Sequence, residues 1–75
     1  MARVLHLLPR PRSPLAATAI HADVDAGDEV VVALLADGPV DPPLPAAVVV
    51  HRVPAEWSYA GLLEQIFAAD RVVTW

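Results

Sequence analysis

A proline-rich segment at residues 39–45 constrains the fold of this chain more strongly than any other feature of its sequence. Four of these seven residues are proline, which excludes both a helix and a central strand. The flanking segments, 29–36 and 46–53, are rich in valine and alanine and have the lengths of buried strands. Because parallel strands are usually joined through a helix, we expect an extended crossover here and one sheet face without a covering helix.

Strand-like segments recur along the rest of the chain. A short apolar run over residues 4–8 ends at Pro9, and a run rich in valine closes the sequence at residues 71–75. An apolar strand with no polar alternation belongs in a sheet that is covered on both faces, as parallel sheets are. Together with the two segments that flank the proline-rich segment, these runs predict four strands, in residues 4–8, 29–36, 46–53 and 71–75.

The first helix is predicted from Leu15 to about Ala26. Ser13 followed by Pro14 is typical of a helix start, with serine as the N-cap and proline in the first turn. Asp23 and Asp25 fall in the last turn, where their negative charge opposes the helix dipole. The sequence offers no compensating charge there. The inner face of this helix is expected to carry Leu15, Ala19, Ile20 and Val24.

A second helix is predicted after Ser58, which is again a suitable N-cap. Trp57 and Leu62 have the spacing of a hydrophobic staple around that cap. Glu64 and Gln65 are expected to face outward. The apolar residues that repeat at helical spacing are Leu62, Leu63, Ile66 and Phe67.

This order, β-α-β-β-α-β, predicts a single α/β domain over residues 1–75. We expect a small, mostly parallel four-stranded sheet in which one crossover helix is missing. A domain of about this size buries only about 60% of the surface that its unfolded chain exposes. Yet 56% of the 75 residues are hydrophobic and only 19% are charged. We therefore expect part of the apolar surface to contact another subunit, in a homo- or hetero-oligomer.

Composition argues against several functional classes. Five arginines and no lysines face nine acidic residues, so the formal charge is −4 and no basic stripe for nucleic acid is present. No apolar run approaches the ~20 residues that span a membrane. The run at 4–8 is too short for a signal-peptide core, which leads us to expect a cytoplasmic protein. Cysteine is absent, which excludes disulfides, thiolate metal sites and a sulfur nucleophile.

The histidines and serines give no sign of catalysis. His6, His21 and His51 lack the spacing of a metal site, so we expect no metal and no cofactor. His6 lies in an apolar run and is expected to be a hydrogen-bonded core or interface residue. Ser13 and Ser58 fit helix caps better than nucleophiles, and neither lies in a nucleophile elbow. Acid–base catalysis by His6 or His51 is the weakest alternative, and we predict no catalytic residue.

The loop after the first strand is the most distinctive candidate site. Ligands of open α/β sheets bind beyond the carboxyl ends of the strands, and a helix begins directly after this loop. Solvated arginines, or arginines that pair with acidic residues of a neighbouring subunit, are the favoured interpretation of Arg10 and Arg12, and an anion site is the alternative. Trp57, Tyr59 and Trp75 form an aromatic set for which packing in the core or an interface is favoured over ligand stacking.

Several segments together resemble the DsrH/TusB branch of the DsrE/DsrF/DsrH sulfur-relay family. They are Leu5-His6 followed by Arg12-Ser13-Pro14, the strand closed by Asp-Gly at 30–38, the aromatic helix from Tyr59-Ala60-Gly61-Leu62-Leu63, and the final Val73-Thr74-Trp75. The sequence departs from the family's pattern at 39–45, where the second helix is replaced, and at Leu62, where the family has phenylalanine. The resemblance implies a flavodoxin-like fold.

The same resemblance implies a non-catalytic accessory subunit. Its partners would be DsrE/TusD-like and DsrF/TusC-like subunits in a complex that passes persulfide sulfur toward tRNA 2-thiouridine or sulfur oxidation. The alternative from the residues themselves is a stand-alone homo-oligomeric binding domain with an anion site at the Arg10/Arg12 loop. The residues expected to contact a subunit or ligand are His6, Arg10, Arg12, Ser13, Trp57, Tyr59 and Trp75.

Overall fold

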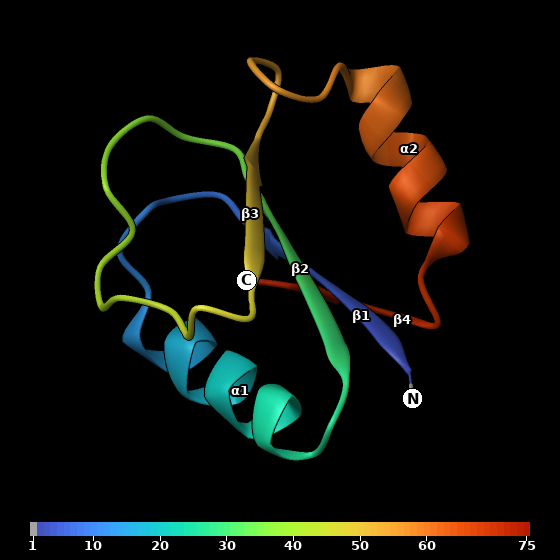
Figure 1. The fold of residues 1–75 in the computed structure, drawn as a ribbon. Helices are drawn as coiled ribbons and strands as arrows, with labels where there is room; N and C mark the ends of the chain where they lie inside the picture. Colours follow the sequence, from blue (N-terminus) through green and yellow to red (C-terminus); the bar gives the residue numbers. More distant parts are fainter. Residues whose placement is uncertain (1) are drawn as a thin grey trace.

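The computed structural model describes residues 2–75 and has a four-stranded, all-parallel sheet with two helices (Figure 1). The strand order in the sheet is β3-β2-β1-β4. This confirms the predicted α/β class and element order, and it is consistent with a small flavodoxin-like fold. The elements are β1 (Arg3–Leu8), α1 (Pro14–Asp25), β2 (Glu29–Leu34), β3 (Val49–Arg52), α2 (Tyr59–Ala68) and β4 (Arg71–Thr74).

The two central strands supply most of the core. β1 and β2 pair in register, with His6 opposite Val32, and β2 is buried at every residue after Glu29. Alternate residues of these strands face opposite sides of the sheet. The side that faces α1 has a cluster of buried residues formed by Leu8, Ala16, Ile20, Val30, Val32 and Leu34.

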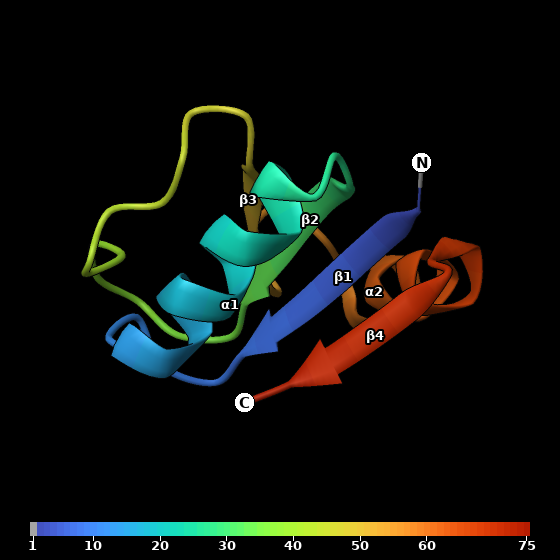
Figure 2. The ribbon, with the colours of Figure 1, turned by 90° about the horizontal axis from the view of Figure 1, so that it is seen from below.

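The second helix covers the opposite side of the sheet, so the prediction of a face without a helix is wrong (Figure 2). Leu62 and Ile66 of α2 pack there against Leu5, Val31 and Ala33. The direction of each crossover explains this arrangement. The chain moves one way across the sheet from β1 to β2 and back the other way from β3 to β4. Because parallel crossovers are right-handed, reversing the direction places the connecting helix on the opposite face.

The proline-rich segment is extended and non-helical, as predicted. It packs on the same side as α1, where Val40, Leu44 and Val48 contact the buried cluster. The third strand is shorter than the predicted 46–53 because the chain turns first. The Val48 N–H donates to the Pro45 carbonyl at 3.0 Å, and pairing with β2 begins only at Val49.

Helix α1 begins as predicted, but its buried face differs from the prediction. The Ser13 hydroxyl accepts the Ala16 N–H at 3.4 Å, which confirms the N-cap. Ala16, Ala17 and Ile20 are buried, whereas Leu15 is 76% exposed. Residues 16, 20 and 24 follow one another at four-residue spacing and share one face, and each helical residue is turned by about 100° from the next. Leu15 is therefore turned away from the sheet.

Helix α2 is held more loosely than α1. Ser58 caps it by accepting the Gly61 N–H at 3.0 Å, but none of its residues is fully buried. Its outward side carries Tyr59, Leu63 and Phe67 at four-residue spacing, and Phe67 is 80% exposed. Neither described helix is both long enough and apolar enough to cross a membrane.

Candidate functional site

A cavity of about 280 Å³ lies beyond the carboxyl ends of β1 and β4. These two neighbouring strands flank the point where the direction of chain progression across the sheet reverses. Such a switch point is where ligands of open α/β sheets bind. The end of β4 lies beside the loop that leaves β1 and the start of α1 (Figure 2). The cavity is lined by Pro9, Arg10, Arg12, Ser13, Pro14, Leu15 and Trp75.

The loop that bears the arginines is fastened to the proline-rich segment. Arg12 Nη1 lies 3.2 Å from Asp41 Oδ2, and both side chains are exposed. The Ser13 N–H donates to the Asp41 carbonyl at 3.3 Å, and the Asp41 N–H donates to the Pro11 carbonyl at 3.0 Å. Arg12 therefore pairs with an acid of its own chain. Exposed pairs of this kind contribute only about 0–1 kcal/mol, so the pair can open for a ligand.

Arg10 is the cation with no competing partner at this cavity. Its side chain is exposed and makes no hydrogen bond or ion pair within residues 2–75. The helix start adds few donors, because Pro14 has no N–H and the Ala16 N–H is held by Ser13. An anion in the cavity would therefore depend on the arginine side chains, and on Arg10 above all.

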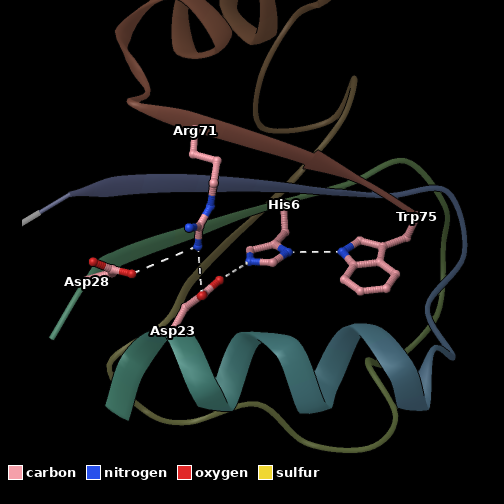
Figure 3. A network of polar contacts seen from close by, with 5 residues as sticks. All are labelled: His6, Asp23, Asp28, Arg71 and Trp75. Carbon is pink, nitrogen blue, oxygen red and sulfur yellow. Dashed lines mark hydrogen bonds and ion pairs between the residues drawn. The ribbon is translucent and has the colours of Figure 1, made fainter. Parts of the chain in front are cut away.

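Trp75 forms one wall of the cavity and is anchored to a buried histidine (Figure 3). Its indole Nε1–H donates to His6 Nδ1 at 2.9 Å. The two rings lie within 13° of parallel with their centroids 6.1 Å apart. Because the centroids are this far apart and a hydrogen bond joins the edges of the rings, the two rings lie side by side rather than face to face. The faces of the indole are therefore not used by this contact.

His6 has no exposed side-chain surface, and both of its ring nitrogens have partners. An indole nitrogen can only donate, so Nδ1 must be the unprotonated nitrogen that accepts from Trp75. The proton of the neutral ring is therefore on Nε2, which lies 2.8 Å from Asp23 Oδ2 and donates to it. The hydrogen bonds thus assign the Nε2–H tautomer to His6.

Arg71 completes this chain of contacts (Figure 3). Its Nη2 donates to Asp23 Oδ1 at 2.8 Å and lies 4.0 Å from Asp28 Oδ2. Asp23 therefore binds a buried imidazole with one oxygen and a guanidinium with the other. Arg71 and His6 provide the compensation that the sequence did not show for this aspartate in the last turn of α1. We name the set Arg71, Asp23, His6 and Trp75 the polar chain.

The other predicted aromatic residues lie elsewhere. Trp57 stacks on His51 with ring centroids 4.3 Å apart, after the outer strand β3. His51 Nδ1 lies 3.8 Å from Glu56 Oε2. Tyr59 is exposed at the start of α2. The structure thus brings Arg10, Arg12, Ser13 and Trp75 together, with His6 behind them, and separates Trp57 and Tyr59 from that group.

Sequence reasoning missed Asp23 and Arg71 as members of this region. Asp23 carried one signal, an acid that is unfavourable for its helix end and therefore needs a specific partner. Arg71 carried none, because only the pairing of β4 with β1 brings it to Asp23. Within residues 2–75 no group of three histidine or acidic side chains is placed to hold a metal ion.

The cavity combines positive charge with apolar surface. Arg10 and Arg12 supply the charge, and the proline rings, Leu15 and the indole of Trp75 supply apolar contact. The Ser13 hydroxyl oxygen accepts the Ala16 N–H as the helix cap. These groups suit the binding of an amphipathic anion.

Comparisons with protein-family models, curated proteins and solved structures find no match to this chain.

Proposed function

We propose that this chain is a small α/β binding domain whose ligand is an anion with a flat apolar part. The observation that carries the proposal is the cavity at the β1/β4 switch point, in which the uncommitted Arg10 faces the same space as the Trp75 indole. A guanidinium recognises a carboxylate, sulfonate or phosphate through paired hydrogen bonds. The indole offers a flat apolar surface to the rest of such a ligand.

The size of the cavity limits the ligand. Its volume of about 280 Å³ is just below the range of about 300–1,000 Å³ that is typical of pockets for drug-sized ligands. One aromatic ring with one anionic group is therefore a suitable probe. With few heavy atoms and an exposed cation, such a probe is expected to bind with Kd on the order of 1 mM.

Benzenesulfonate tests the proposal by NMR titration of the full chain. We expect the Trp75 indole N–H and the backbone amides of residues 10–15 to shift, while the indole N–H of Trp57 stays in place as an internal reference. Neutral benzenesulfonamide has the same ring and should bind several-fold more weakly. Salt should also weaken the sulfonate complex, because Arg10 is exposed and its charge is screened.

Two matched variants locate the site. Arg10→Gln should lower the affinity for benzenesulfonate about five- to tenfold, since it removes the uncommitted charge. Arg3→Gln makes the same change in net charge at the other end of β1, where Arg3 donates to Gln65 at 2.7 Å, and should leave the affinity unchanged. Equal loss in both variants, or equal shifts of both tryptophans, would reject the proposed site.

A second candidate function is supported by the exposed side of α2. Tyr59, Leu63 and Phe67 form an apolar ridge that nothing in residues 2–75 covers, and such ridges are typical of subunit contacts. This observation favours the accessory subunit implied by the resemblance, working in the cytoplasm with DsrE/TusD-like and DsrF/TusC-like partners. In that function the chain would support persulfide transfer without carrying sulfur itself.

The test of this candidate is reconstitution with such partner subunits. Phe67→Glu should weaken co-assembly at least about tenfold, because a charge at the centre of an interface must be desolvated. Leu15→Glu changes an equally exposed apolar residue outside the ridge and should assemble normally. Persulfide transfer that is equally fast without this chain would reject the relay function.

A further inference from the structure

The Trp75 indole, which forms one wall of the cavity, is held in place by a contact with a buried residue. Trp75 is 39% exposed and lines the cavity, but its only side-chain hydrogen bond within residues 2–75 goes to the fully buried His6. The orientation of the indole therefore depends on Nδ1 of His6 remaining an acceptor. Asp23, oriented by Arg71, fixes the proton on the other nitrogen and so keeps Nδ1 free.

A second proton on His6 would break this contact and no other in the polar chain. The imidazolium ring donates from both nitrogens. Its Nε2–H would still donate to Asp23, but its Nδ1–H would oppose the indole N–H across the present 2.9 Å contact. Two donors cannot share a hydrogen bond, so the indole must leave its position.

We infer that His6 is a positioning residue for Trp75 and that uptake of a proton by His6 releases the cavity wall, so that ligand binding at the cavity is linked to pH. This inference rests on the proposed function, because it concerns the regulation of the same cavity. Linkage is reciprocal, so a ligand that needs the anchored Trp75 must also oppose proton uptake by His6. Histidine is the side chain that ordinarily changes charge between about pH 5 and 8.

Within residues 2–75, the charged groups linked to His6 by hydrogen bonds or ion pairs are Asp23, Arg71 and Asp28. Asp23 faces the ring from α1, Arg71 reaches Asp23 from β4, and Asp28, just before β2, lies 4.0 Å from Arg71. The register neighbours of His6 in β2 and β4 are Val32 and Val73.

The sign of the expected pH dependence separates this inference from general electrostatics. Acidification makes a chain with a formal charge of −4 less negative, and this alone would strengthen anion binding. Release of Trp75 would weaken it. We therefore expect the affinity for benzenesulfonate, which stays ionised throughout, to fall about tenfold as His6 becomes protonated.

Two substitutions at His6 each preserve one of its two side-chain hydrogen bonds and remove the other. In His6→Asn the amide oxygen can occupy the place of Nδ1, which keeps an acceptor for Trp75 that cannot titrate. In His6→Gln the amide nitrogen can occupy the place of Nε2, which keeps the donor to Asp23 and removes the acceptor. We expect binding by His6→Asn to vary less than twofold with pH, and binding by His6→Gln to be weak at every pH.

The main test is an NMR pH titration of the wild-type full chain, with and without benzenesulfonate. This test does not require any variant to fold. The His6 ring nitrogens should report the Nε2–H tautomer at neutral pH, and the Trp75 indole N–H should move with the same midpoint as His6. The amide signals of β2 should keep their dispersion and so show that the fold is intact. The Trp57 indole is followed separately, because it stacks on another histidine ring, that of His51.

The outcomes distinguish the inference from the proposed function. If the Trp75 resonance does not move when His6 takes up its proton, or if affinity is constant or rises toward acid pH, the inference is overturned and the binding site stands. If benzenesulfonate binds at no pH, the proposed function is rejected, and the linkage to binding is rejected with it. Coincident midpoints together with the tenfold loss of affinity would support both.

Discussion

At the scale of single residues, Asp23 has the most consequential position in this molecule. Its two carboxylate oxygens join His6 of β1 to Arg71 of β4, and through His6 it determines how Trp75 is held. Hydrogen bonds to charged groups contribute about 1.5–3 kcal/mol each, and an unpaired buried donor costs about as much. A residue that the helix dipole disfavours is thus retained by contacts with two strands.

We predict that Asp23→Ala lowers the free energy of unfolding by about 2 kcal/mol, because it leaves the Nε2–H of a fully buried ring without an acceptor. The other tautomer cannot relieve this, since it would lose the bond to Trp75 instead. Urea denaturation measures the change. Asp25→Ala, at an exposed position in the same helix turn, should change the free energy by less than about 0.5 kcal/mol. Equal effects would contradict this description of the polar chain.

At the scale of elements, the two helices are anchored to the sheet in different ways. Helix α1 has three buried residues, of which Ala16 and Ile20 join the cluster on the sheet face, whereas α2 has no buried residue. Helical periodicity in the sequence shows that a helix has an apolar face, but it places that face only to within about one residue. For α1 the difference between Leu15 and Ala16 decided which side chain entered the core.

Ile20→Ala should therefore destabilise the protein by about 2–5 kcal/mol, the range for removing a large aliphatic side chain from a packed core. Leu15→Ala removes a similar side chain from the same helix and should change the free energy of unfolding by less than about 0.5 kcal/mol. Thermal or urea unfolding of the two variants side by side checks the assignment. A larger loss for Leu15→Ala would restore the inner face predicted from the sequence.

At the scale of the whole molecule, the sheet has two faces of unequal packing. The α1 face combines a helix with the proline-rich segment over a cluster of six buried residues. The α2 face has a smaller buried cluster beneath a helix that stays partly exposed. Regions with few buried apolar contacts open more readily than the rest of a protein.

Hydrogen exchange should reveal this asymmetry. We expect the amides in the middle of α2 to exchange at least about tenfold faster than those in the middle of α1, because opening α2 exposes less buried surface. Binding of a partner to the apolar ridge at Tyr59, Leu63 and Phe67 should slow exchange in α2 and leave α1 unchanged. Equal protection of both helices in the isolated chain would show that α2 packs more tightly than its exposure indicates.

The sequence by itself was enough to determine the element order, the parallel sheet, both serine caps and the non-helical crossover at 39–45. These features depend on local rules: the periodicity of apolar residues, the chemistry of helix starts and the missing N–H of proline. The position of Arg10 and Arg12 beyond the end of β1 also followed from that order.

Only the tertiary structure decided which face α2 covers, how the cavity is closed and what His6 does. The face of α2 depends on the order β3-β2-β1-β4, which sets the direction of the last crossover. The polar chain joins residues that are 17, 48 and 69 positions apart. No local pattern encodes contacts at such separations, because they arise only when parallel pairing brings β4 beside β1 and α1 packs across them.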